Sequence, residues 1–191
     1  FEDKGYALVL VNVGSDHSAL TGEYAAVPAE MKQIAAVFGK ERLCEVDPAA
    51  FDSEVVRLRR ELGDRPVLRA LHYWRENDLV LKRWGALQAG DIDAFLELTR
   101  ESGASSAMFL QNVSVGGAPE QSAMVALGLA ERLLEGRGAC RIHGGGFGGS
   151  IQAFVPVERV DAFLAGMDSW FGEGASRHYR IVPEGAAYAW L

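Results

Sequence analysis

Residues 138–155 read Gly138-Ala-Cys-Arg-Ile-His-Gly-Gly-Gly-Phe-Gly-Gly-Ser-Ile-Gln-Ala-Phe-Val155, and this stretch decides the fold. Residues 138–142 and 150–155 are short and largely apolar, which predicts two strands. Between them, five of the six residues from 144 to 149 are glycine. A glycine within regular structure costs about 0.5–1 kcal/mol relative to alanine, and a tight hairpin needs only about one or two. The cluster therefore predicts positive φ at several positions, or a close approach of the backbone to a ligand or another segment.

The glycine cluster has the spacing of a dinucleotide fingerprint at Gly144, Gly146 and Gly149. That fingerprint needs a helix after the loop, whereas a strand is predicted here, and the Gly-Lys-Ser/Thr ending of a P-loop is absent. Two interpretations remain: a wide, strained hairpin packed beneath a helix, or a backbone surface whose amides face a phosphate or a sugar. His143, directly before the cluster, is either a ligand contact or a strand-end histidine bonded to backbone.

The segments around this stretch extend the pattern in both directions. Downstream, residues 157–171 predict a helix and residues 179–182 a final strand. Upstream, residues 6–13 are nearly all apolar and predict a first strand that is buried on both faces. The order predicts an α+β fold, a split β-α-β (ferredoxin-like) antiparallel sheet of about four strands backed by helices.

The middle of the chain is helical in pattern. Helices are predicted over residues 21–38, from Asp47-Pro48 onward, from Pro66 to Gly90, after an Asp91 cap, and with Pro119 in a first turn. Residues from about 48 to 112 are predicted to form an inserted helical bundle. The long helix opened by Pro66 is predicted to bury more than one side, through Val67, Leu68, Leu71, Trp74, Leu79, Leu81 and Trp84.

Composition narrows the class of protein. The 191 residues are 49% hydrophobic and 24% charged, and 19 Lys plus Arg against 26 Asp plus Glu give a net charge of −7. This balance argues against nonspecific nucleic-acid binding, and no apolar run approaches the roughly 20 residues that span a membrane. No signal-peptide pattern is present. Because the chain opens at Phe1 directly before a core strand, we expect it to be part of a longer protein; tag removal or processing would give the same start.

The cysteines predict neither a metal site nor a redox motif. Cys44 and Cys140 are far apart in sequence, and neither belongs to a Cys-x-x-Cys pair. We therefore expect two buried thiols in a reducing cytosol, which predicts a cytoplasmic location.

The stretch 138–155 resembles the third signature motif of galactokinases, members of the galactokinase, homoserine kinase, mevalonate kinase and phosphomevalonate kinase (GHMP) superfamily. Arg69-Ala-Leu-His-Tyr-Trp-Arg-Glu-Asn77 is similar to a further family stretch. Residues 101–106, 110–112 and 20–24 follow the family pattern as well. The resemblance covers nearly the whole chain, in order.

The resemblance implies that residues 1–191 are the C-terminal domain of a sugar kinase whose active site lies between two lobes. Such an enzyme transfers the γ-phosphate of ATP to the anomeric hydroxyl of galactose. The first two signature motifs, the catalytic Asp and its assisting Arg belong to the N-terminal lobe, so no catalytic residue and no metal ligand is assigned here. ATP and Mg²⁺ are expected to be bound mainly by that lobe. The resemblance thus implies that the partners of residues 1–191 are the sugar, ATP and the N-terminal lobe of the same protein. Residues 1–191 alone are expected to be inactive.

Only matching residues acquire a role from the resemblance. Tyr24 corresponds to a tyrosine that hydrogen-bonds a sugar hydroxyl, against the alternative of a core tyrosine at a helix start. His17 and His143 are expected to have structural or supporting roles. The loop that closes the active site near the phosphates and sugar corresponds to Gly144, Gly145, Gly146, Phe147, Gly148 and Gly149.

The sequence departs from the family pattern near the first strand. Asn12 and Val13 stand where many bacterial relatives carry Asp and Thr, which removes a charge and a hydroxyl expected near the sugar. This leaves two alternatives open: a kinase for a related sugar, such as an N-acetylated one, or a noncatalytic galactose-binding or regulatory homologue.

Overall fold

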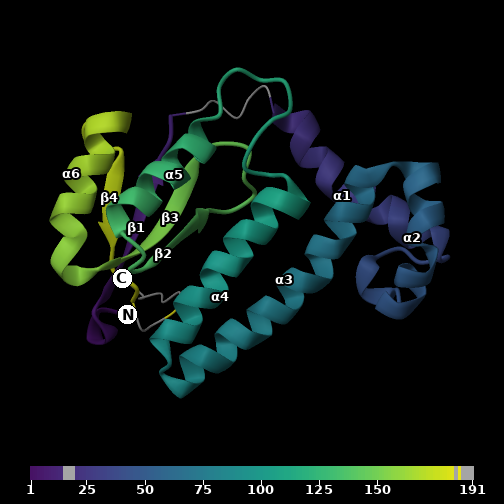
Figure 1. The fold of residues 1–191 in the computed structure, drawn as a ribbon, viewed down its shortest axis with the longest axis horizontal. Helices are drawn as coiled ribbons and strands as arrows, with labels where there is room; N and C mark the ends of the chain where they lie inside the picture. The colour runs from purple at the N-terminus through teal and green to yellow at the C-terminus, as the bar shows by residue number, and fades with distance from the viewer. Residues whose placement is uncertain (15–19, 183–184, 186–191) are drawn as a thin grey trace, which may run out of the picture.

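The computed structural model describes residues 1–14, 20–182 and 185, and its centre is one four-stranded sheet (Figure 1). The strands lie in the order β2-β3-β1-β4, and each neighbouring pair is antiparallel. Their bounds are β1 (Tyr6–Asn12), β2 (Ala139–Ile142), β3 (Ser150–Pro156) and β4 (Ser176–Tyr179). This order is that of a split β-α-β arrangement, so the predicted α+β fold is confirmed.

The helices follow the local signals in the sequence closely. Asp47 and Asp91 each accept a hydrogen bond from a first-turn amide, and Gly90 ends a helix with a φ of 68°. None of the described helices has the length and apolar character needed to cross a bilayer. The helices are α1 (Thr21–Val37), α2 (Pro48–Leu62), α3 (Asp64–Ala89), α4 (Ile92–Ser105), the π-helical turn η4 (Ser106–Leu110), α5 (Ser122–Leu134) and α6 (Val160–Phe171), with short 3₁₀ turns η1 (Glu2–Lys4), η3 (Leu43–Glu45) and η5 (Val157–Arg159).

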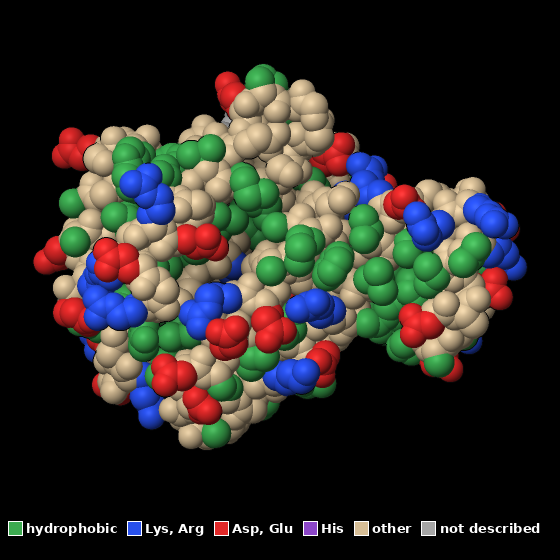
Figure 2. All heavy atoms as spheres, in the orientation of Figure 1, with side chains coloured by type: hydrophobic (Ala, Val, Ile, Leu, Met, Phe, Trp, Pro, Cys, Tyr) green, Lys and Arg blue, Asp and Glu red, His purple; other side chains and the backbone are tan. Residues whose placement is uncertain are grey.

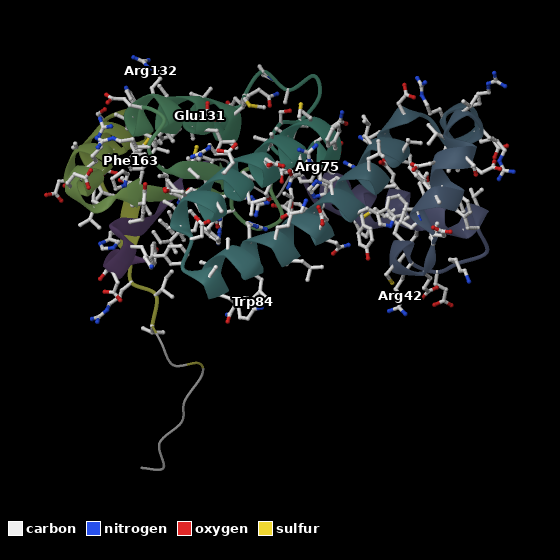
Figure 3. The ribbon with its side chains drawn as sticks, turned by 60° about the horizontal axis from the view of Figure 1, so that its bottom comes forward. Arg42, Arg75, Trp84, Glu131, Arg132 and Phe163 are labelled. Atoms are coloured by element: carbon white, nitrogen blue, oxygen red, sulfur yellow. The ribbon has the colours of Figure 1, made fainter. Side chains whose placement is uncertain are left out.

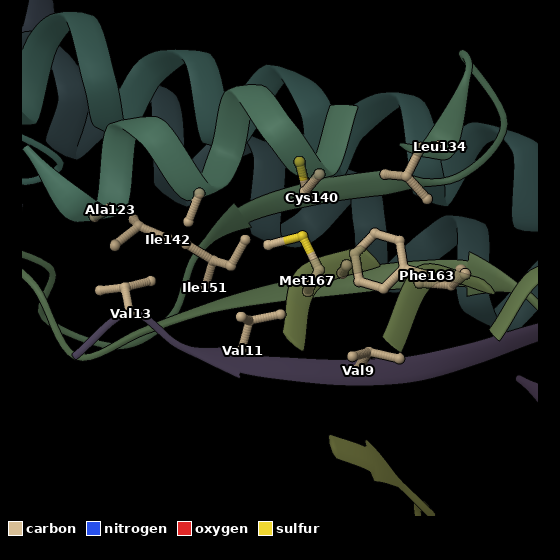
Figure 4. Close-up of a cluster of buried hydrophobic side chains, with 14 of the residues drawn as sticks. Val9, Val11, Val13, Ala123, Leu134, Cys140, Ile142, Ile151, Phe163 and Met167 are labelled. Atoms are coloured by element: carbon tan, nitrogen blue, oxygen red, sulfur yellow. The ribbon is translucent and has the colours of Figure 1, made fainter. Parts of the chain in front are cut away.

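The main apolar core lies between one face of the sheet and helices α5 and α6 (Figure 4). Val9 and Val11 of β1 pack there with Phe163 and Met167 of α6. The opposite face of the sheet is covered by α4 and the end of α3, and a third apolar cluster joins α1, α2 and α3 in a helical arm to one side (Figure 1). The glycine-rich loop joins β2 to β3 at one end of the sheet.

The first strand is buried on one face only. Ala7, Val9 and Val11 are buried, whereas Leu8 and Leu10 are half-buried. The prediction of two buried faces was therefore wrong, because the second face is only partly covered by α4 and the N-terminal residues.

Helix α3 buries more than one side, as predicted: Val67 and Ala70 join the cluster of the helical arm and Ala86 joins the cluster beside α4. Three of the residues predicted to be buried are not. Leu71, Leu81 and Trp84 are exposed, the last two by 71% and 62%. Figure 3 shows Trp84 pointing away from the helix, and Figure 2 shows hydrophobic side chains reaching the surface around the helical arm. The buried residues of α3 also include two polar ones, Arg69 and His72, which the apolar pattern did not indicate.

Two element bounds differ from the predictions. The last strand is β4, which shares only Tyr179 with the predicted 179–182; it begins at Ser176, whose amide and hydroxyl donate to Asp168 at 2.8 and 2.6 Å. Helix α5 begins three residues after Pro119, because the Gln121 side chain closes the preceding loop by bonding the backbone of Val115 and Ala118.

Candidate functional site

The loop between β2 and β3 has a backbone that few residues other than glycine adopt. Gly144, Gly146, Gly148 and Gly149 have φ values of 68°, 86°, 133° and 73°. Phe147 also has a positive φ, 56°, which is costly for a residue with a side chain. Positive φ at several positions was one of the two explanations predicted for the glycine cluster, and it applies.

Two residues from distant parts of the chain hold this loop. The Phe147 amide donates to the Asn112 carbonyl at 2.5 Å, and Asn112 Nδ2 donates to the Gly145 carbonyl at 3.1 Å. The Tyr24 hydroxyl donates to the Gly146 carbonyl at 2.5 Å. Three consecutive residues of the loop are thus bonded from the start of α1 and from the segment that follows η4.

The same contacts leave no space for side chains at two glycines. A Cβ on Gly145 would lie 2.7 Å from Tyr24 Cε1. A Cβ on Gly146 would overlap the carbonyl oxygen of Asn112 and lie 2.6 Å from its Nδ2. The Phe147 ring is buried and packs edge-on against Tyr24, with the ring centroids 5.2 Å apart. Close approach of other segments is therefore a second reason for the glycines.

Two buried amides of the loop indicate a place for a ligand. Gly146 and Gly148 are buried, yet their N–H groups donate to no acceptor among the described residues. Buried N–H groups are nearly always paired, so these donors suit an anionic or carbonyl oxygen. A hollow of about 200 Å³ adjoins Gly148 and Phe147 and reaches Ser122 at the start of α5. No side chain caps that helix start, so its first amides add positive potential.

The structure places the other predicted residues as follows. His143 is exposed at the strand end; its Nδ1 lies 2.9 Å from Gln152 Oε1, and its amide donates to the Ser150 carbonyl. His17 lies outside the described residues. Val13 is buried in the main core, so this departure from the family pattern serves packing. Asn12 Oδ1 accepts from the Gly14 amide at 2.9 Å.

Sequence reasoning did not assign the polar residues of α3. Arg69 is fully buried; its Nη1 lies 2.8 Å from Glu30 Oε2 on α1, and its Nε donates to the Leu110 carbonyl at 3.3 Å. Burial lowers the pKa of Arg69, and the charge of Glu30 opposes that shift. Arg69, His72 and Glu76 are three and four residues apart, which places them on one helix face. That spacing of polar residues was a readable signal.

His72 and Glu76 continue this polar face toward α4. His72 Nδ1 lies 2.9 Å from Ser105 Oγ, and burial lowers the pKa of the imidazole. Glu76 accepts from Ser102 Oγ at 2.7 Å and lies 2.9 Å from Arg83 Nη2. Hydrogen-bonded polar groups therefore join α3 to α4, where apolar packing was expected.

The possible metal ligands and the two cysteines were the remaining groups that could carry chemistry. Within residues 1–14 and 20–182, no three His, Cys, Asp or Glu side chains gather as metal ligands would. Burial raises the pKa of the Cys140 thiol to about 12. Cys44 is exposed, which corrects the prediction of two buried thiols, and both cysteines are free.

No protein-family model matches the chain. Curated galactokinases do. The galactokinase of Glaesserella parasuis is 33% identical over 159 residues, which are 83% of this chain and 40% of that protein. The galactokinase of Streptomyces lividans is 30% identical over 178 residues, 93% of this chain and 42% of that protein. The chain thus spans about two fifths of the length of these relatives.

Solved structures agree on the fold. A crystal structure of Lactococcus lactis galactokinase complexed with galactose superimposes with a TM-score of 0.67 at 24% identity, over 92% of this chain and 44% of that one. A crystal structure of L. major mevalonate kinase in complex with R-mevalonate superimposes with a TM-score of 0.56 at 18% identity, over 95% of this chain and 44% of that one. The chain is therefore a homologue of part of the galactokinases, and it has the fold of the domain that they share with mevalonate kinase.

Proposed function

We propose that this chain is the C-terminal lobe of an ATP-dependent galactokinase, which transfers the γ-phosphate of ATP to the anomeric hydroxyl of galactose and releases galactose 1-phosphate. In this proposal residues 1–191 form one lobe, with residues 48–112 as a helical insertion, and act in the cytoplasm against an N-terminal lobe of the same polypeptide. The observation that carries it is the glycine loop, where buried amides without a described acceptor lie beside a tyrosine hydroxyl. The galactokinase relatives support it.

The glycine loop supplies positioning and charge stabilisation, which phosphoryl transfer chiefly requires. The amides of Gly146 and Gly148 donate to oxygens of the phosphate chain, and the exposed Gly144 and Gly145 cover the site against water. Since the described residues offer no acidic cluster, the N-terminal lobe provides the ligands of Mg²⁺ and the catalytic base. No catalytic base is proposed in this chain.

Tyr24 links the loop to the sugar. Its hydroxyl donates to the Gly146 carbonyl, and a phenolic oxygen can also accept a hydrogen bond from a sugar hydroxyl. His143 supports the strand end through Gln152, and His17 is assigned a structural role in its loop. Tyr24 is thus the substrate-binding residue of this lobe.

The test is a coupled ATPase assay with galactose and Mg²⁺. The polypeptide that carries this chain behind an N-terminal lobe of galactokinase type is compared with the chain alone. We expect galactose-dependent ATP turnover from the first and none from the second. Galactose binding without phosphate transfer by the joined protein would instead favour the noncatalytic regulatory homologue, and a higher kcat/KM for an N-acetylated sugar would favour the related-sugar kinase.

Tyr24→Phe tests the assigned site within that enzyme. Losing one hydrogen bond of about 1 kcal/mol raises the KM for galactose about five-fold. The matched control is Tyr73→Phe, on a tyrosine that packs in the helical arm. Equal KM values for Tyr24→Phe and the parent enzyme would remove Tyr24 from the sugar site.

A further inference from the structure

The two residues that hold the glycine loop stand on elements that meet at one buried side chain. Tyr24 belongs to α1, and Asn112 follows η4 by two residues. Arg69 of α3 reaches both elements: its Nη1 lies 2.8 Å from Glu30 Oε2 on α1, and its Nε donates to the carbonyl of Leu110, the last residue of η4. One guanidinium therefore bridges the supports of Tyr24 and Asn112.

The ion pairs around Glu30 distinguish Arg69 from its neighbour Arg65. The Arg69 side chain is only 1% exposed and that of Glu30 only 11%. The second oxygen of Glu30 lies 2.5 Å from Arg65 Nη2, so the carboxylate is shared by two arginines. Arg65 is 46% exposed and pairs also with Glu23. Of the two arginines on Glu30, Arg69 is the one that also bonds the end of η4.

The backbone from η4 to Asn112, which includes the Leu110 carbonyl that Arg69 bonds, has an uncommon conformation that depends on contacts from other segments. Residues 106–110 form a π-helical turn, and Gln111 follows with a φ of 57°, in the left-handed region. π-helical turns and left-handed non-glycine residues are uncommon and persist where surrounding contacts hold them. The bond from Arg69 Nε to the Leu110 carbonyl is such a contact, directly before Gln111.

We propose that Arg69 is a positioning residue for the glycine loop: it holds α1 and the end of η4 in the one alignment that lets Tyr24 and Asn112 bond adjacent peptide groups of residues 145–147. Its effect on phosphoryl transfer rests on the proposed function, whereas its effect on the loop does not. The guanidinium touches neither the loop nor its ligand and acts through the two residues that do.

The test measures hydrogen exchange of the Phe147 amide, which is bonded to the Asn112 carbonyl. In Arg69→Met we expect exchange to rise at least about ten-fold, since the loop opens without global unfolding. Amides of the β1–β3 ladder serve as the internal reference for global stability, and the Phe147 amide is expected to lose clearly more protection than they do. The matched control is Arg65→Met, which loses a contact to the same Glu30 but none to Leu110, and its Phe147 amide stays within about two-fold of the parent.

A double variant separates positioning from simple stability. Removing one partner of a buried ion pair is strongly destabilising, whereas replacing both by apolar residues is often neutral. Glu30→Leu combined with Arg69→Met is therefore expected to recover the urea midpoint of the parent while the Phe147 amide stays unprotected. Recovery of both would show a merely structural role and overturn the proposal, as would unchanged protection in Arg69→Met.

Kinase assays of the same variants distinguish this proposal from the proposed function. If the chain serves no galactokinase, none of the proteins transfers phosphate, and the exchange results still decide the role of Arg69. If the chain belongs to an active galactokinase but Arg69 has no positioning role, Arg69→Met keeps the kcat of the parent. If both hold, Arg69→Met lowers kcat at least about ten-fold, and Arg65→Met leaves it within about two-fold.

Discussion

Two interfaces of the molecule, that of the sheet with α5 and α6 and that of α3 with α1 and α4, are held together by different chemistry. Against α5 and α6 the contacts are apolar, and Cys140 is the one titratable residue of that core within the described chain. The other face of the sheet packs against α4 through apolar residues too, but beyond it α3, which lies beside α1 and α4 (Figure 1), meets these two helices through buried polar groups. The buried polar side chains there are Glu30, Arg69, His72, Thr99, Ser102, Ser105, Ser106 and, just after η4, Asn112.

The difference teaches how a loop acquires a fixed shape. Apolar contact is nondirectional and tolerates small shifts, whereas buried hydrogen bonds demand defined distances and angles. The glycine loop begins and ends in strands of the apolar core, yet Tyr24 and Asn112 reach it from the polar side. The apolar core thus places the loop, and the polar interface sets its conformation.

The largest effect is expected from a substitution in the apolar core between the sheet and α6. Phe163→Ala removes a fully buried ring from the main core and should lower the free energy of unfolding by about 3–5 kcal/mol, through lost burial and a cavity. Urea unfolding measures it. Trp170→Ala, on the same helix but 44% exposed, is the control and should cost clearly less. Equal losses for the two would mean that this core is not the main source of stability.

An intermediate effect is expected from a substitution in the polar interface between α3 and α4. Ser105→Ala leaves His72 Nδ1 without its partner in a buried site, which should cost about 1–3 kcal/mol of unfolding free energy. Ser53→Ala, which removes an exposed hydroxyl, is the control and should change little. A Ser105→Ala protein as stable as the parent would show that this hydrogen bond contributes nothing.

The pH dependence sharpens the comparison, because only the polar side carries a buried imidazole. Burial lowers the pKa of His72 below its ordinary 6.5. The unfolded chain therefore binds more protons than the folded one below about pH 6.5, and stability falls as pH falls through that range. Urea unfolding at several pH values between about 7.5 and 5 should show a shallower slope of unfolding free energy against pH for His72→Gln. An identical slope would assign the dependence to carboxyl groups.

The smallest effect is expected from a surface ion pair that belongs to neither interface. Arg57 on α2 is half-exposed and pairs with Glu54 at 3.2 Å and Glu61 at 3.7 Å. Such surface pairs contribute little, so Arg57→Ala should change the unfolding free energy by about 0.5 kcal/mol or less. A loss as large as that of Ser105→Ala would contradict the distinction between exposed and buried polar contacts.

Local features of this protein were readable from the sequence. The strand–glycine–strand pattern of residues 138–155, the Asp91 cap and the Gly90 stop each predicted the element that the structure contains. The positive φ values of the loop followed from its glycines. These features depend on the conformational preferences of a few neighbouring residues, which any stretch of sequence carries with it.

Contacts between distant residues were decided by the tertiary structure alone. Tyr24 and Gly146 are 122 residues apart, and no local preference predicts that the hydroxyl of one bonds the carbonyl of the other. The same holds for Arg69 and Glu30, and for the exposure of Trp84, whose apolar character suggested burial. The sequence by itself determined which conformations each segment could take; only packing of the whole chain determined which side chains met, because that choice depends on all the segments at once.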